Sequence, residues 1–139
     1  MELLEYIYDD GGRNKYFKGK TGDCVCRAIA IASGRDYKEV YDILFKTMGE
    51  SPRSGVFTKK EKFKRMMQSF GFTWVATSGI GSHQAVHFVP GDLPSGNLVC
   101  ATAKHYVAVV DNKVHDIFDS RVNPFGECRK IYGYWKFVG

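Results

Sequence analysis

The hydrophobic pattern of this 139-residue chain changes its period near Gly71, and this change limits the folds open to it. Before Gly71, apolar residues recur every three or four positions, as on one face of an α-helix. After it they alternate, or run in short segments rich in β-branched and aromatic residues, as in strands. This order predicts an α+β fold, with N-terminal helices packed on a C-terminal antiparallel β-sheet. The chain has no repeat, low-complexity tract or linker, so residues 1–139 are expected to form one domain.

Helical spacing and end signals predict three helices, at residues 23–33, 36–48 and 58–70. Gly34 follows the first helix as a C-terminal cap. The second and third helices each begin with a capping box, a polar residue with a glutamate three positions later. These pairs are Asp36 with Glu39, and Thr58 with Glu61.

Strands are expected at residues 72–76, 97–102, 105–110, 114–118 and 131–138, with residues 2–8 as an edge strand or a packed arm. The segment 111–113 (DNK) is expected to form a tight hairpin turn. If all three residues lie in the turn, Val110 pairs with Val114, and counting outward brings His105 opposite Asp119. A shift of one residue would change the face of every side chain, so this pairing depends on the length of the turn.

The composition excludes several classes of protein. With 44% hydrophobic and 25% charged residues the chain is typical of soluble globular proteins. No apolar run could span a membrane, and the N-terminus lacks the pattern of a signal peptide, so a cytoplasmic location is expected. Four cysteines inside a cell indicate thiols, and without a C-x-x-C pair a zinc ribbon is not expected. His83 and His87 have the spacing of helical metal ligands, but no glutamate accompanies them, so we expect neither metal nor cofactor.

The formal net charge is +5, and basic residues gather at positions 13–20 and 59–65. These clusters are either a solvated loop and a solvated helix face, or contacts for an acidic partner or nucleic acid. Net charge alone argues for solubility more than for one partner. Nucleic acid therefore stays open as a partner but is not favoured.

The strongest candidate for a reactive group lies in the segment 21–33, TGDCVCRAIAIAS. A Gly-Asp turn leads into an Ala/Ile-rich, buried helix, so Cys24 lies in its first turn. Helix N-terminal amides carry partial positive charge and favour a thiolate. The alternative for Cys24 is a buried structural thiol. Cys26 points away from the face of Cys24, and a buried Arg27 needs a carboxylate partner.

His105 is the candidate base and Asp119 the candidate carboxylate that orients it. With Cys24 they supply the nucleophile, base and orienting group of thiol catalysis. The alternative for His105 is a strand-end histidine with a satisfied hydrogen bond. The developing oxyanion would be bound by the backbone N–H of Cys24 and by a side chain from the preceding loop. Asn14 and Lys18 are both candidates for that side chain.

Two segments, GDCVCRAIAIA and HYVAVVDNKVHDIFDS, resemble the papain-like cysteine peptidases, and among them the compact C39-like group of bacteria and phages. The resemblance covers residues 22–32 and 105–119. It implies a papain-like fold with Cys24 as nucleophile, His105 as base and Asp119 as orienting group. The oxyanion glutamine usual in that family, a few residues before the cysteine, is absent, since the glutamines are Gln68 and Gln84. The resemblance also suggests a phage gene, which would place the protein in the host cytoplasm.

We therefore expect a cysteine peptidase or amide hydrolase that acts on a peptide or protein through a thioester intermediate. The alternative hypothesis is a catalytically inactive papain-like protein. Such a protein would use its basic surface to bind a host protein or nucleic acid.

Overall fold

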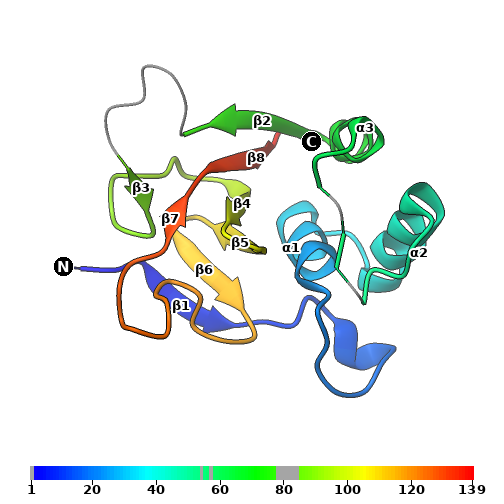
Figure 1. The fold of residues 1–139 in the computed structure, drawn as a ribbon, viewed down its shortest axis with the longest axis horizontal. Coiled ribbons are helices and arrows are strands. Elements are labelled where there is room, and N and C mark those ends of the chain that lie inside the picture. The colour runs from blue at the N-terminus through cyan, green and yellow to red at the C-terminus, as the bar shows by residue number, and fades with distance from the viewer. Residues whose placement is uncertain (1, 54, 57, 78–84) are drawn as a thin grey trace.

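The structure, a computed structural model, describes residues 2–53, 55–56, 58–77 and 85–139 (Figure 1). The helices in these residues are η1 (Arg13–Lys15), α1 (Cys24–Ser33), α2 (Tyr37–Met48) and α3 (Glu61–Ser69). The six-stranded sheet has the order β1 (Glu5–Tyr8), β6 (Lys113–Asp116), β5 (His105–Val110), β4 (Asn97–Thr102), β8 (Gly133–Phe137) and β2 (Phe72–Ala76). A smaller sheet pairs β3 (Val86–His87) with β7 (Lys130–Ile131).

The α+β class expected from the sequence is confirmed, with α1, α2 and α3 on one side of the sheet (Figure 1). The sheet is mostly antiparallel. Its edge strand β1 runs parallel to β6, so the expectation of an antiparallel sheet is wrong at that edge. The reason is that β1 enters the sheet from the other end of the sequence, where no hairpin determines its direction.

Helix α1 begins and ends close to the expected residues. Asp23 is its N-cap, and Gly34 ends it in the left-handed conformation, with φ of 73°. Its alanines and isoleucines pack mainly against β5, because small side chains let the helix approach the strand closely. The first residue of α1 and the first residue of β5 are brought together by this packing.

Helix α2 has the expected cap, in which the Asp36 side chain accepts a hydrogen bond from the Glu39 amide. Helix α3 begins three residues later than expected, after Lys60, and no side chain caps it in the part of the chain that the structure describes. The expected cap from Thr58 is wrong. The Thr58 hydroxyl instead contacts the phenol of Tyr106, so a tertiary contact has replaced the local one.

The hairpin between β5 and β6 turns on two residues, not three. Asp111 and Asn112 have φ of 48° and 64°, the left-handed conformation that Asp and Asn tolerate best after glycine. Val110 therefore pairs with Lys113, and the register is shifted by one residue from the expected one. This shift decides which carboxylate reaches His105.

The expected last strand is divided into β7 and β8 at Tyr132. Its neighbour Gly133 lies under the indole of Trp74, where a Cβ atom would come within 2.2 Å of the ring. The first piece pairs with β3 and the second with β4 and β2. A glycine inside a strand often marks such a close approach.

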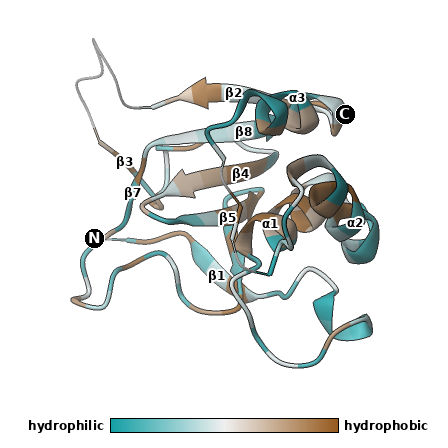
Figure 2. Cartoon of the chain, turned by 45° about the vertical axis from the view of Figure 1, so that its right-hand side comes forward, coloured by the Kyte–Doolittle hydropathy of each residue, from teal (hydrophilic) through white to brown (hydrophobic). Residues whose placement is uncertain are grey.

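Hydrophobic side chains form a core on each face of the sheet. The helix side holds one core, to which α1, α2 and α3 all contribute. On the other face the residues near β3, among them Phe88 and Leu93, cover β4, β5 and β6. Figure 2 shows the hydrophobic colouring concentrated in β4 and along α1, where the sheet and the first helix meet. No helix in the described residues is long and apolar enough to cross a membrane.

Candidate active site

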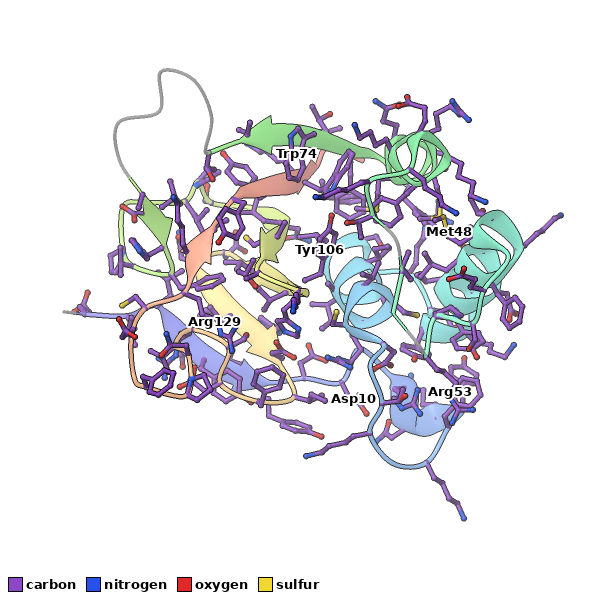
Figure 3. All side chains as sticks on the ribbon, viewed as in Figure 1. Asp10, Met48, Arg53, Trp74, Tyr106 and Arg129 are labelled. Carbon is purple, nitrogen blue, oxygen red and sulfur yellow. The ribbon has the colours of Figure 1, made fainter. Side chains whose placement is uncertain are left out.

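The thiol of Cys24 and the imidazole of His105 lie within hydrogen-bonding reach of each other. Cys24 is the first residue of α1 and His105 the first residue of β5, and α1 packs along β5. Figure 3 shows Tyr106, the residue after His105, at the boundary between the strands and α1. Two of the three expected site residues are thus in contact, although 81 positions separate them in the chain.

The carboxylate that holds the imidazole is Asp116. Its Oδ2 lies 2.6 Å from Nε2 of His105, which leaves Nδ1 as the ring nitrogen for the thiol. Asp119, the residue expected there, does not contact His105. Asp119 binds the guanidinium of Arg121 through two contacts of 2.8 Å. The two-residue turn is the cause of this error, because the one-residue shift in register moves Asp119 out of reach.

Asp116 is itself held from two sides. Its Oδ1 accepts a hydrogen bond from the Ile117 amide at 2.7 Å, and it lies 3.4 Å from Nη2 of Arg27. Arg27 lies on α1, so this ion pair ties the carboxylate to the helix that carries Cys24. The expectation that Arg27 has a carboxylate partner is therefore confirmed, and Arg27 has two such partners, Asp116 and Asp23.

Asp23, the N-cap of α1, is fully buried and forms the centre of a charged cluster. Its carboxylate accepts from Arg27, from Arg13 at 3.3 Å, and from the hydroxyl of Tyr37. An aspartate at this position usually caps the first helical amides. Here the side chain is turned to these donors and makes no cap hydrogen bond. The positive end of α1, including the Cys24 amide, is thus left uncapped by Asp23.

The surroundings of Cys24 favour its thiolate. Burial raises the pKa of the thiol, but the hydrogen bond and charge of His105, an amide of Tyr106 and the charge of Arg27 together lower it below its ordinary value. Burial lowers the pKa of His105, but Asp116 and Cys24 outweigh this and raise it to about 9. A lowered thiol pKa beside a raised imidazole pKa favours a thiolate–imidazolium pair.

Two other cysteines have surroundings of the opposite kind. Burial raises the pKa of Cys26 to about 12, and it also raises the pKa of Cys100. Cys26 points into the core and its Sγ lies 3.7 Å from the carbonyl oxygen of Tyr37. A buried thiol with a raised pKa is unreactive. Cys26 and Cys100 are both fully buried core residues.

Cys24 and His105 line a cleft of about 940 Å³. Its other walls come from the segment before α3, from α3, and from the aromatic residues of β2 and β8. Asn14 and Lys18, the expected oxyanion donors, do not line this cleft. Both are exposed and line a separate hollow beside Asp9 and Asp10. The loop before α1 turns away from the thiol because Arg13, the residue before Asn14, is anchored on Asp23.

Two contacts were not expected from the sequence: that of Asp116 with His105 and that of Asp23 with Arg27. Two features of the sequence could have indicated these contacts. The Asp111–Asn112 pair is typical of a two-residue turn, and a buried arginine one turn after an aspartate favours an (i, i+4) ion pair. His115 lies on β6, and its Nδ1 is 2.9 Å from Oδ2 of Asp9, which joins β6 to the loop after β1.

The candidate metal ligand His83 lies outside the described residues. Within those residues, no group of three or more histidine, cysteine or carboxylate side chains could hold a metal ion.

Comparison with protein-family models, with curated proteins and with solved structures gives no significant match to this chain.

Proposed function

We propose that this protein is a papain-like cysteine peptidase or amide hydrolase with Cys24 as nucleophile, His105 as general base and acid, and Asp116 as orienting group. One observation carries the proposal. A thiol at the start of a buried helix contacts an imidazole whose far nitrogen is held by a buried carboxylate at 2.6 Å. Nucleophile, base and orienting group in this relation are the requirement for acyl transfer by a thiol.

The reaction has two steps. The Cys24 thiolate attacks the carbonyl carbon of an amide, forming a C–S bond, while an electron pair moves to the carbonyl oxygen. The C–N bond then breaks, and the His105 imidazolium gives its Nδ1 proton to the leaving amine. In the second step neutral His105 takes a proton from water, whose oxygen attacks the thioester carbon. The C–S bond breaks, which releases a carboxylic acid and restores the thiolate–imidazolium pair.

Negative charge develops on the carbonyl oxygen in both steps. The backbone N–H of Cys24, at the positive end of α1, is the donor we assign to that oxygen. Its availability follows from the orientation of Asp23, which binds two arginines in place of the helix amides. Asn14 and Lys18 are not assigned this role, because they lie outside the cleft.

An electrophilic thiol probe such as chloroacetamide tests the proposal, with mass spectrometry to locate the label. We expect labelling of Cys24 at neutral pH, its loss in Cys24→Ala, and a large decrease in His105→Ala. Cys26→Ala is the matched control on the same helix and should label normally, because burial raises the pKa of Cys26 to about 12. Peptide hydrolysis that survives Cys24→Ala, or preferential labelling of another cysteine, would contradict the proposal.

A second candidate function is binding without catalysis, favoured by the exposed basic residues on and before α3. Lys59, Lys60, Lys64 and Arg65 are all exposed there. Binding of a host protein or nucleic acid that weakens with salt and is unchanged in Cys24→Ala, together with no turnover of any amide, would favour this function.

A further inference from the structure

Three lysines line the cleft that holds Cys24. Lys59 precedes α3, Lys64 lies on α3, and Lys104 precedes His105 in the turn between β4 and β5. All three are exposed, and none has an ion-pair partner among the described residues. The described carboxylate that lines the same cleft is Glu61. Lysine charges therefore outnumber carboxylates around the thiol.

The charged groups around Cys24 and His105 do not offset the positive charge of these lysines. The thiolate, Asp116 and Asp23 carry three negative charges, and the imidazolium, Arg27 and Arg13 carry three positive charges. The cluster is thus neutral when the thiolate–imidazolium pair forms. The electrostatic potential in the cleft is then determined mainly by the lysines at its rim.

The cleft also exposes large aromatic side chains. Trp74 is 42% exposed and Tyr132 is 44% exposed, and both line the cleft. The indole of Trp74 is fixed in place, because it lies over Gly133 and 5.2 Å from the ring of Trp135. A rigid exposed aromatic surface of this kind binds bulky apolar side chains at low entropic cost.

We propose that the cleft selects polypeptide segments in which acidic side chains lie close to a bulky apolar side chain. The inference deepens the proposed function, on which it rests, by naming the substrate class. The lysines would bind the carboxylates, and Trp74 and Tyr132 would bind the apolar side chain. A polypeptide is favoured over nucleic acid because the thiol–imidazole pair reacts at acyl carbons, which a peptide carries beside its carboxylates and a phosphodiester backbone does not.

Binding to the Cys24→Ala variant tests this specificity without turnover. Three peptides of equal length, free of tryptophan and each with one phenylalanine, would carry glutamate, glutamine or lysine at the flanking positions. Tryptophan fluorescence reports binding, because both tryptophans of the chain line the cleft and Trp74 is 42% exposed. We expect the glutamate peptide to bind about tenfold more tightly than the glutamine peptide, as three exposed ion pairs worth about twofold each would give. Salt should reduce the difference.

A matched pair of variants separates a cleft effect from a net-charge effect. Lys59→Gln/Lys64→Gln removes two charges that line the cleft, and Lys62→Gln/Arg65→Gln removes two from the same part of the chain that do not. The first variant should weaken binding of the glutamate peptide by about fourfold, and the second should change it by less than about twofold. Equal losses, or equal affinity for the three peptides, would overturn the inference.

The same measurements also distinguish binding of nucleic acid from binding of peptide, and failure of the specificity from failure of the catalysis. Tighter binding of a single-stranded oligonucleotide than of the glutamate peptide, with displacement of that peptide, would overturn the inference in favour of nucleic acid. Probe labelling of Cys24 in the unmodified protein tests the proposed function separately. A protein that labels but shows no acidic preference would refute only the specificity. One that prefers acidic peptides but neither labels nor hydrolyses would refute only the catalysis.

Discussion

Two carboxylates near the end of one hairpin have different surroundings. Asp116 is 3% exposed and is held by His105 and Arg27. The side chain of Asp119 is 38% exposed and pairs with Arg121. Only the first lies where it can fix the tautomer and angle of an imidazole. Because the two residues have the same side chain and lie three positions apart, they provide an internal control.

Replacement of each aspartate by asparagine should separate the two roles. Asp116→Asn keeps the shape of the side chain but removes the charge that raises the pKa of His105, so fewer molecules hold the thiolate–imidazolium pair. We expect the rate of amide hydrolysis to fall by about 10²-fold or more. Asp119→Asn should leave the rate within about twofold. Steady-state kinetics on one peptide checks both, and equal losses would contradict the assignment of Asp116.

The proposed hydrolysis should depend on pH through the two shifted pKa values, those of Cys24 and His105. Since the pKa of Cys24 is lowered, the thiolate forms at a lower pH than for an ordinary cysteine, and the rate should rise there. The pKa of His105 is raised to about 9, so the imidazolium proposed to protonate the leaving group is lost as the pH rises through that value. We expect a bell-shaped profile whose alkaline limb lies near pH 9.

The Asp116→Asn variant provides the control for this profile. Loss of the carboxylate should lower the pKa of His105 and move the alkaline limb to lower pH. An alkaline limb that does not move would argue that a group other than His105 donates the proton.

The sequence predicted that Cys24 lies at a helix start and His105 at a strand start, and the structure places both there, because these positions depend on local signals. The expectation for Asp119 is wrong because the position of that residue depends on the length of a turn six to eight positions earlier. Asp111 and Asn112 both adopt the left-handed conformation and form a two-residue turn. The free energy of such a turn differs little from that of a three-residue turn, so the sequence did not decide between them. An error of one residue in a hairpin changes every pair beyond it.

Helix α1 is tied to the rest of the molecule by alternating buried charges, Arg13, Asp23, Arg27 and Asp116. Arginine is suited to this position, since its planar group can bind two carboxylates at once. Arg27 does so, and joins the N-cap of α1 to the carboxylate that orients His105. In the proposed mechanism Arg27 is a positioning residue, because it contacts Asp116 and its charge lowers the pKa of Cys24.

Methionine substitutions of the two arginines should separate stability from reactivity. Arg13→Met and Arg27→Met each leave a buried carboxylate short of a partner, and each should lower the free energy of unfolding by about 3–5 kcal/mol. Only Arg27→Met also releases Asp116 and removes a charge that lowers the pKa of Cys24. We expect it to slow alkylation of Cys24 in the folded protein by about tenfold and to move the acid limb upward. Arg13→Met should change neither.

Denaturant unfolding and the pH profile of alkylation measure these effects, and Arg27→Lys should restore part of the reactivity. Identical pH profiles for Arg13→Met and Arg27→Met would show that Arg27 acts only on stability.

At the level of elements, the sequence predicted the helices well, because their caps and apolar stripes are local. Two errors, one at a helix cap and one in the last expected strand, have tertiary causes. Thr58 contacts Tyr106 and does not cap α3, and Gly133 lies beneath Trp74 at the point where the expected last strand divides. Neither contact is visible in a local pattern, since each joins residues at least 48 positions apart.

At the level of the whole molecule, the α+β class followed from the change of period, but the strand order did not. The sheet places β8 between β4 and β2 and adds β1 beside β6. These pairings join distant segments, and several orders would satisfy the same hydrophobic pattern. The candidate site lies on the helix side of this sheet, where α1 meets β5, so its assembly requires the fold as a whole.

Because Asp116 is buried and the His105 side chain is only 12% exposed, their ionisation should contribute to the stability of the entire fold. Burial raises the pKa of Asp116, but the imidazole and the Ile117 amide outweigh this and bring it below its ordinary value. The contribution of Asp116 is therefore present above about pH 4 and is lost as the pH falls. The pKa of His105 is raised, so its contribution is complete below about pH 6.5 and is lost as the pH rises. The pair should therefore stabilise the fold most between these two values.

Unfolding free energies of Cys24→Ala and of Cys24→Ala/Asp116→Asn, measured between pH 3 and pH 9, check this expectation without titration of the thiol at position 24. The difference between the two variants should reach about 3–5 kcal/mol near pH 5 and shrink on both sides. Asp119→Asn in the same background should give a smaller difference that shrinks only in acid, because Asp119 is solvated and its partner Arg121 stays charged. A difference that does not change with pH would mean that Asp116 stabilises the fold by shape alone. The imidazolium–carboxylate pair on which the proposed chemistry depends would then not exist in the folded protein.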